Sequence, residues 1–162
     1  MKMGLLPQKM RMMLDEYLYE ALDVEPREYF PRKPYYTCFD KLCIIHEGSG
    51  KYWSATQLYS GEWIGLIIHG KPYLSPVIYE KIYGSKGLRA AIIVKDKGAK
   101  AFLYGNDVLY ESVSKIIPPI EYPVAVIDET DNTVIGVARR VAGAKPYFQN
   151  IYDLGIFLRL FG

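Results

Sequence analysis

Two arginines and a lysine near the C-terminal end are the residues best suited to bind a charged ligand. Arg139 and Arg140 interrupt an apolar, strand-like run, and Lys145 follows after a glycine turn. Arginine forks match phosphate oxygens bidentately and can stack on bases. Because adjacent side chains on a strand face opposite ways, at most one arginine can point outward on a given face unless the strand bulges or ends there. The alternative is a solvent-facing pair at a sheet edge, which would oppose aggregation.

Other residue combinations that could do chemistry are incomplete. The run Gly48–Lys51 has part of a phosphate-binding loop, but Ile45 and Tyr52 stand where that loop needs a glycine and a hydroxyl. A hairpin turn is the favoured interpretation. His46 and His69 are each expected at a strand end, and neither comes with a nucleophile motif. We therefore expect no catalytic residues and no enzyme activity.

The two cysteines are predicted to be core residues. Cys38 and Cys43 are expected on one extended strand, five positions apart and on opposite faces, which argues against a disulfide. A zinc site would need two more ligands, and the chain has only two histidines. We expect no metal and no cofactor, and this use of cysteine fits a reducing compartment.

Composition limits the classes of function. The chain has 162 residues, a net charge of +2 and 50% hydrophobic residues, so it can bury a real core. Because the charge is nearly balanced, any nucleic-acid site must be a local cluster of basic side chains. No apolar run approaches the roughly 18 residues of a membrane span. We expect no membrane association and a soluble protein in the cytoplasm.

Spacing and turn residues predict an N-terminal α/β domain over residues 1–86. Apolar residues recur at helical spacing, and Ser75 followed by Pro76 is typical of a helix start. We predict helices over 7–22 and from Pro76 to Gly84, strands over 36–45, 51–54 and 63–69, and a helical turn over 55–59. The strands are expected to form a small mixed sheet.

Residues 87–162 are predicted to form a second domain, a small barrel or sandwich of short strands, so the fold class is α+β. The domain boundary is placed at residues 84–87, after the helix. We predict strands over 88–94, 101–104, 124–128, 134–141 and 146–151. Short helices are expected over 106–114 and 153–160, with Asp153 as the N-cap of the last helix.

Three segments resemble a known family. The run Phe102–Leu109 (FLYGNDVL) and the later Gly136-Val137-Ala138 resemble the PUA domain, named for pseudouridine synthases and archaeosine transglycosylases. The closing run Asp153–Arg159 (DLGIFLR) is similar to the ending of one PUA variant, the nuclear import protein seven family of ribosome-biogenesis factors. The resemblance covers roughly residues 36–160. It implies an N-terminal α/β domain joined to a C-terminal PUA-type pseudo-barrel.

The resemblance also implies binding to ribosomal precursor RNA and a part in assembling the large ribosomal subunit. Archaeal members favour U- or A-rich RNA, which they contact through basic residues of the PUA domain. By position, the matching RNA-binding residues here are Arg139, Arg140 and Lys145. Asn106 belongs to the motif turn, but Asp107 departs from the family pattern and its carboxylate would repel phosphate.

Further side chains could extend this surface. Lys97 and Lys100 could enlarge the basic patch, although solvated loop lysines are the more common case. Tyr147 and Phe148 are candidates for base stacking, or else they fill the barrel.

Two other functions remain open. The N-terminal domain could dock other ribosome-assembly or RNA-processing factors, so that RNA contact is incidental. An RNA-modifying enzyme is the third hypothesis, and residues 1–87 are too short for a synthase core. The oligomeric state is not predicted.

Overall fold

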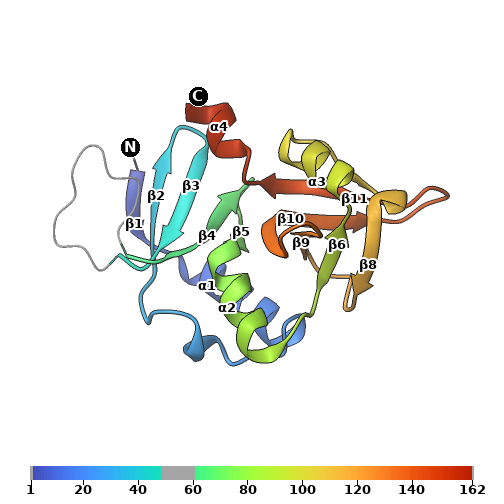
Figure 1. Ribbon diagram of the computed structural model, residues 1–162. Coiled ribbons are helices and arrows are strands. Elements are labelled where there is room, and N and C mark those ends of the chain that lie inside the picture. Colours follow the sequence, from blue (N-terminus) through green and yellow to red (C-terminus); the bar gives the residue numbers. More distant parts are fainter. Residues whose placement is uncertain (1, 49–60, 162) are drawn as a thin grey trace. The chain divides into compact units, whose positions relative to one another are not determined.

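The structure, a computed structural model, describes residues 2–48 and 61–161. The chain forms two compact units, Met1–Ile82 and Tyr83–Gly162 (Figure 1). The boundary predicted after residue 86 lies at the end of the helix that begins in unit 1. In the described ranges, no helix is long and apolar enough to cross a membrane. The same ranges contain no group of three or more His, Cys, Asp or Glu side chains that could hold a metal ion.

Unit 1 is built on a five-stranded sheet in the order β1-β2-β3-β4-β5. Every pairing is antiparallel, whereas we expected a mixed sheet. The predicted α+β class is confirmed. The elements of this unit are β1 (Lys2–Leu5), α1 (Gln8–Glu20), a 3-10 turn (Pro26–Glu28), β2 (Tyr35–Phe39), β3 (Leu42–His46), β4 (Trp63–Ile68), β5 (Lys71–Leu74) and the start of α2 (Pro76–Lys86).

The two helices predicted for the N-terminal half are confirmed. In α1, Leu14 and Leu18 are buried, four residues apart on one face. The Ser75 hydroxyl caps α2, because it accepts a hydrogen bond from the Ile78 amide at 3.3 Å. The helix runs past the expected end at Gly84 and stops at Lys86.

The prediction of one strand over residues 36–45 was wrong, because the segment is a hairpin of β2 and β3. Asp40, at φ +54°, starts the tight turn between the paired residues Phe39 and Leu42. Such turns are signalled most strongly by Asn-Gly or Asp-Gly, and here the pair is Asp-Lys.

The hairpin also corrects the prediction for the cysteines. Cys38 and Cys43 are direct cross-strand partners, with Cα atoms 3.9 Å apart, and they form a disulfide. Because the turn folds the segment back on itself, the argument that they point to opposite faces does not apply. The disulfide also removes cysteine usage as a reason to expect a reducing compartment.

The remaining predictions for unit 1 concern its other strands and turns, and some of them fall outside the described residues. The strand predicted over 63–69 is confirmed as β4, whereas β1 and β5 were missed. The strand predicted over 51–54 and the helical turn over 55–59 lie outside the described residues, as does most of the turn over 48–50.

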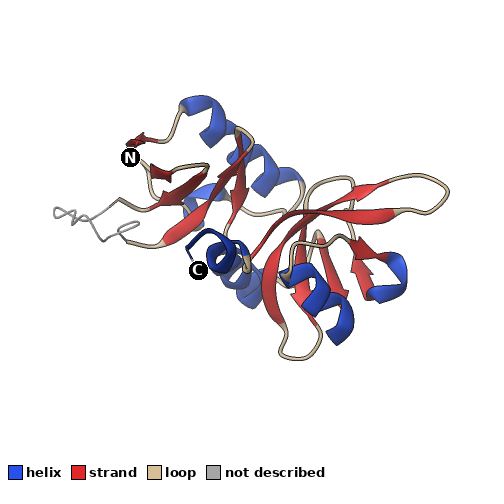
Figure 2. Cartoon of the chain, turned by 90° about the horizontal axis from the view of Figure 1, so that it is seen from above, coloured by secondary structure: helices blue, strands red, loops and turns tan. Residues whose placement is uncertain are grey.

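Unit 2 is a curled six-stranded sheet in the order β7-β11-β10-β9-β6-β8, in which only β6 and β9 pair in parallel (Figure 2). Strands predicted around β6, β9, β10 and β11 are present. The elements are β6 (Ala91–Val94), α3 (Asp96–Leu103), β7 (Val108–Leu109), a 3-10 turn η2 (Tyr110–Ser112), β8 (Val113–Ile117), β9 (Val124–Asp128), β10 (Thr133–Val141), β11 (Tyr147–Asp153) and α4 (Ile156–Phe161).

Two predictions for the first half of unit 2 were wrong. The strand expected over 101–104 is the end of α3, whose residues Gly98, Ala99 and Phe102 are buried at helical spacing. The helix expected over 106–114 is instead β7, η2 and the start of β8. Pairing decides both strands there, since Val108 lies opposite Phe148 of β11 and β8 pairs with β6.

The core of unit 2 lies inside the curled sheet. Phe102, Phe148 and Tyr152 are its largest buried side chains, each at most 1% exposed. Burial raises the pKa of the Tyr152 hydroxyl well above its ordinary range, so this group stays neutral inside the core.

Candidate RNA-binding surface

The hairpin of β10 and β11 carries the predicted arginines past the end of β9. β9 pairs with β10 only as far as Ala138, so Arg139 and Arg140 have a strand neighbour on the β11 side alone. Both views of the chain show the tip of this hairpin extending past the neighbouring strands (Figures 1 and 2). Both arginines are exposed, and β9 does not continue alongside β10 at this point.

The two arginines lie on opposite faces of the hairpin, as strand alternation requires. Arg139 is the cross-strand partner of Gln149, which is exposed, and Arg140 is the partner of Phe148, which is buried. The predicted cluster is therefore divided between two faces. Lys145 is exposed in the loop between the strands.

Arg140 is held against the neighbouring element η2. Its Nε donates a hydrogen bond to the Tyr110 hydroxyl at 2.7 Å. The Tyr110 ring stacks on Phe148, with 5.1 Å between centroids and 14° between planes. Phe148 thus fills the core, which is one of the two roles that the sequence left open for it, and Tyr147 is half-buried.

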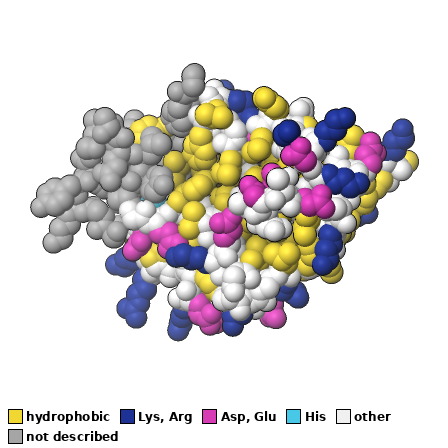
Figure 3. Space-filling model, in the orientation of Figure 1, with side chains coloured by type: hydrophobic (Ala, Val, Ile, Leu, Met, Phe, Trp, Pro, Cys, Tyr) yellow, Lys and Arg dark blue, Asp and Glu magenta, His cyan; other side chains and the backbone are white. Residues whose placement is uncertain are grey.

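The basic side chains of this hairpin are available to a ligand. Among the residues that the structure describes, no carboxylate forms an ion pair with Arg139, Arg140 or Lys145. In Figure 3, Lys and Arg side chains lie over unit 2 with acidic side chains between them. Basic and acidic side chains are thus interspersed on this face, in keeping with the nearly balanced net charge.

Helix α3 supplies the two predicted lysines. Lys97 and Lys100 are exposed and lie three residues apart, hence on neighbouring parts of one helix face. The Lys100 Nζ lies 3.1 Å from an Asp96 carboxylate oxygen, and both side chains are more than half exposed. Such an exposed ion pair contributes little to stability and leaves Lys100 able to exchange partners.

A pocket of about 490 Å³ lies between α3 and the segment that carries β7 and η2. Its volume falls within the usual range for small-molecule sites. The lining residues are Lys97, Gly98, Ala101, Asn106, Asp107, Leu109 and Ser112. The pocket thus brings together two predicted site residues, Lys97 and Asn106, from different elements.

Asp107, which departs from the family pattern, has a structural task here. One of its carboxylate oxygens accepts a hydrogen bond from the Asn150 backbone amide at 2.9 Å. Its charge still lies on the pocket wall. Because like charges repel, a phosphate is better placed beside Lys97 than beside Asp107.

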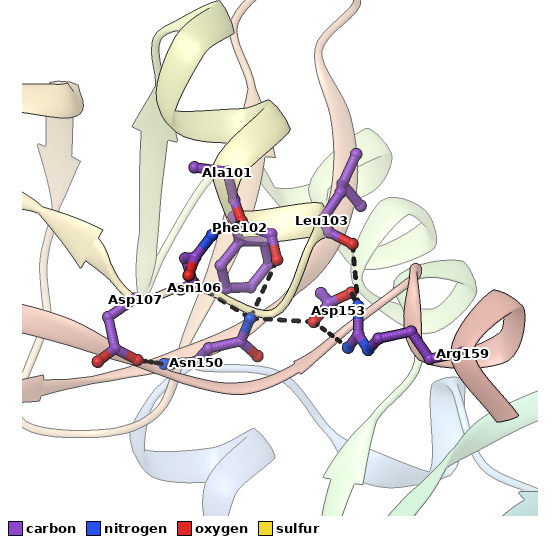
Figure 4. A network of polar contacts seen from close by, with 8 residues as sticks. All are labelled: Ala101, Phe102, Leu103, Asn106, Asp107, Asn150, Asp153 and Arg159. Atoms are coloured by element: carbon purple, nitrogen blue, oxygen red, sulfur yellow. Dashed lines mark hydrogen bonds and ion pairs between the residues drawn. The ribbon is translucent and has the colours of Figure 1, made fainter.

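A polar network fixes the turn that forms one wall of the pocket (Figure 4). The Asn150 side-chain amide donates to the Phe102 carbonyl at 3.1 Å and to the Asn106 carbonyl at 3.3 Å. The same amide group lies 3.0 Å from a carboxylate oxygen of Asp153. Asn150 therefore ties β11 to both ends of the turn.

Arg159 completes this network from α4. It binds both carboxylate oxygens of Asp153, at 3.2 and 2.8 Å, and donates to the Leu103 carbonyl at 3.0 Å. The two segments that carry the family resemblance, around residues 102–109 and 153–159, are thus joined directly. Asp153 is 1% exposed and lies at the end of β11, so its predicted role as the N-cap of α4 was wrong.

We name the set Lys97, Asn106, Tyr110 and Arg140 the basic strip. Within this set, the Tyr110 hydroxyl binds Arg140, and in the sequence Tyr110 stands between the pocket residues Leu109 and Ser112. Sequence reasoning missed Tyr110 and Asn150. Nothing in the local sequence of either residue signals its role, since each acts on a partner 30 or more positions away.

Comparison with known proteins identifies the second unit. Residues 90–162 match the family described as UPF0113 PUA domain. No curated protein matches the chain.

Three solved structures illustrate the similarity of the fold. A hypothetical protein of Pyrococcus horikoshii aligns with TM-score 0.68 and 13% identity, over 94% of each chain. A conserved PUA domain protein of Thermoplasma acidophilum aligns with TM-score 0.58 and 10% identity, over 99% of this chain and 100% of that one. A PUA domain protein of Aeropyrum pernix, solved as a tartrate complex, aligns with TM-score 0.58 and 16% identity, over 95% and 86%.

At these identities the likeness shows the fold, and it extends over both units. The sequence match covers the unit that carries the basic strip. Residues 90–162 of this chain are a PUA domain, a kind of domain that generally binds RNA.

Proposed function

We propose that this chain is a non-catalytic RNA-binding factor that grips single-stranded or U/A-rich RNA through the basic strip of its PUA domain. The observation that carries the proposal is the exposed Arg140 guanidinium, which binds the Tyr110 hydroxyl. In the sequence, Tyr110 stands between Leu109 and Ser112, which line the same pocket as Lys97. Phosphate contacts supply affinity without sequence information, and unpaired bases can enter or stack near such a pocket.

We further propose that the RNA is ribosomal precursor RNA and that the protein acts in rRNA maturation and large-subunit assembly. This step rests on the similarity of residues 102–109 and 153–159 to the nuclear import protein seven family. It implies a protein in the cytoplasm, or in the nucleus and nucleolus of a eukaryotic source.

The non-catalytic part of the proposal is supported by the environment of the histidines. His46 is fully buried and its Nε2 lies 2.9 Å from the Thr37 hydroxyl, so it is committed inside unit 1. His69 is exposed in the turn after β4, at φ +49°. Neither ring has the surroundings of a general base.

The alternative proposal is a protein–protein adaptor in a ribosome-assembly or RNA-processing complex. Large apolar side chains are exposed on unit 1, which favours a docking role for it. They are Met3 and Leu5 of β1 and Met12 and Tyr19 of α1. Partners that stay bound to the full-length protein after RNase treatment would favour this alternative.

Crosslinking the full-length protein to RNA in its own cells, followed by sequencing of the attached fragments, tests the proposed function. We expect ribosomal precursor RNA to be enriched, with crosslinks mapping to peptides of residues 90–162. Enrichment of unrelated RNAs would contradict the role in ribosome assembly. Absence of crosslinked RNA would contradict RNA binding itself.

A further inference from the structure

Tyr110 occupies an unusual position for a tyrosine of a small β-rich domain. It starts the 3-10 turn η2 and is half-buried. Its ring lies nearly parallel to that of Phe148, which is 0% exposed. The ring is therefore fixed by the core, while the hydroxyl reaches Arg140 on the exposed hairpin at 2.7 Å.

This contact leaves a defined part of the guanidinium free. An arginine presents five N–H donors in a rigid plane, and two edges of that plane can bind a phosphate bidentately. The edge that includes Nε is occupied by the Tyr110 hydroxyl. The remaining edge, formed by the two terminal nitrogens, is the only one still able to bind two phosphate oxygens at once.

The contact also restricts a flexible side chain before any ligand arrives. Ordering a long side chain on binding costs free energy, and a group already held in place avoids part of that cost. An aromatic ring needs no hydroxyl to stack on Phe148, so the stacking does not explain the polar contact.

We propose that Tyr110 is a positioning residue that holds Arg140 for end-on, bidentate contact with one RNA phosphate at the rim of the pocket. The proposal rests on the proposed RNA-binding function. Leu109 and Ser112, which stand on either side of Tyr110 in the sequence, line the pocket, and the proposal therefore places this phosphate next to it.

The test is a double-mutant cycle on the full-length protein with a short oligouridylate. Tyr110→Phe keeps the stacked ring and removes only the hydroxyl, and we expect it to weaken binding about fivefold. Arg140→Ala should weaken binding about tenfold and lower the salt dependence by the equivalent of one phosphate contact. In the Arg140→Ala background, Tyr110→Phe should have no further effect.

Tyr104→Phe is the matched control. Tyr104 is 82% exposed in the same unit, and its hydroxyl has no partner among the described residues. We expect wild-type affinity for this variant. Thermal unfolding of Tyr110→Phe should stay near that of the wild type, because the ring contact is kept.

The outcomes distinguish a failure of the positioning role of Tyr110 from a failure of the proposed RNA-binding function. If the wild type binds RNA and Tyr110→Phe binds equally well, the positioning role is wrong. Equal losses from Tyr110→Phe with and without Arg140 would show a merely structural role and overturn it too. If the wild type shows no salt-dependent binding at all, the proposed function fails and this inference fails with it.

Discussion

Asp153 shows how a single buried charge organises the PUA domain. Its carboxylate is 1% exposed, and the donors that surround it come from Arg159 and Asn150. A buried carboxylate is tolerated only when such partners satisfy it. Because the same partners bind the carbonyls of residues 102, 103 and 106, the charge fixes the turn on which Asn106 lies.

Replacing Asp153 with Ala should destabilise unit 2 by about 2 kcal/mol, since it leaves the donors of Asn150 and Arg159 without their acceptor. The value lies below the usual cost of breaking a fully buried pair because Arg159 is 44% exposed and can be hydrated. Chemical denaturation followed by far-UV circular dichroism measures the loss. Glu121→Ala, at an exposed position, is the control. An unfolding curve for Asp153→Ala that matches this control would contradict the assigned role.

The residue types of the candidate site could be predicted from the sequence, but their grouping could not. The Arg-Arg pair before a glycine turn indicated a phosphate site, and alternation predicted that its members face opposite ways. Which of the two lies near other site residues depends on Tyr110, a residue 30 positions away from Arg140. Such a contact leaves no local signal in the sequence.

At the scale of elements, prediction succeeded where a segment carries its own pattern. Strand β9 and the first half of β10 are nearly all buried, so their apolar runs are long and unambiguous. Strand β5 contains Pro72, which is tolerated because β5 is at the edge of its sheet. Strand β7 has only two residues, so pairing with β11 defines it rather than its own sequence.

The disulfide that joins β2 and β3 leads to a prediction about the stability of unit 1. Replacing Cys38 and Cys43 with Ser should destabilise unit 1 by about 2 kcal/mol, at the low end for disulfides because the closed loop is short. Trp63 lies in unit 1 and residues 83–162 contain no tryptophan, so tryptophan fluorescence follows the unfolding of unit 1.

Adding a reductant should shift the wild-type unfolding midpoint toward that of the double variant and leave the double variant unchanged. Two free thiols in the oxidised, purified protein would contradict the disulfide. So would identical wild-type curves with and without reductant.

At the scale of the whole molecule, the chain folds into two units and carries almost no net charge. With a net charge of +2, long-range attraction to RNA is weak, so binding must depend on the few cations of the basic strip. The exposed apolar residues of unit 1 offer a separate surface that does not require RNA. The account therefore predicts that RNA affinity responds to single charges on one face of the β10–β11 hairpin.

The most direct test compares Arg139→Ala with Arg140→Ala in a salt series on a short U-rich RNA. Both variants lose the same charge at adjacent positions, but the side chains lie on opposite faces. We expect Arg140→Ala to lower the salt slope by about 0.7, the value for one contact to single-stranded RNA, and Arg139→Ala to stay close to the wild type. Equal slopes for the wild type and Arg140→Ala, or an equal loss in both variants, would contradict a phosphate site on the Tyr110 face.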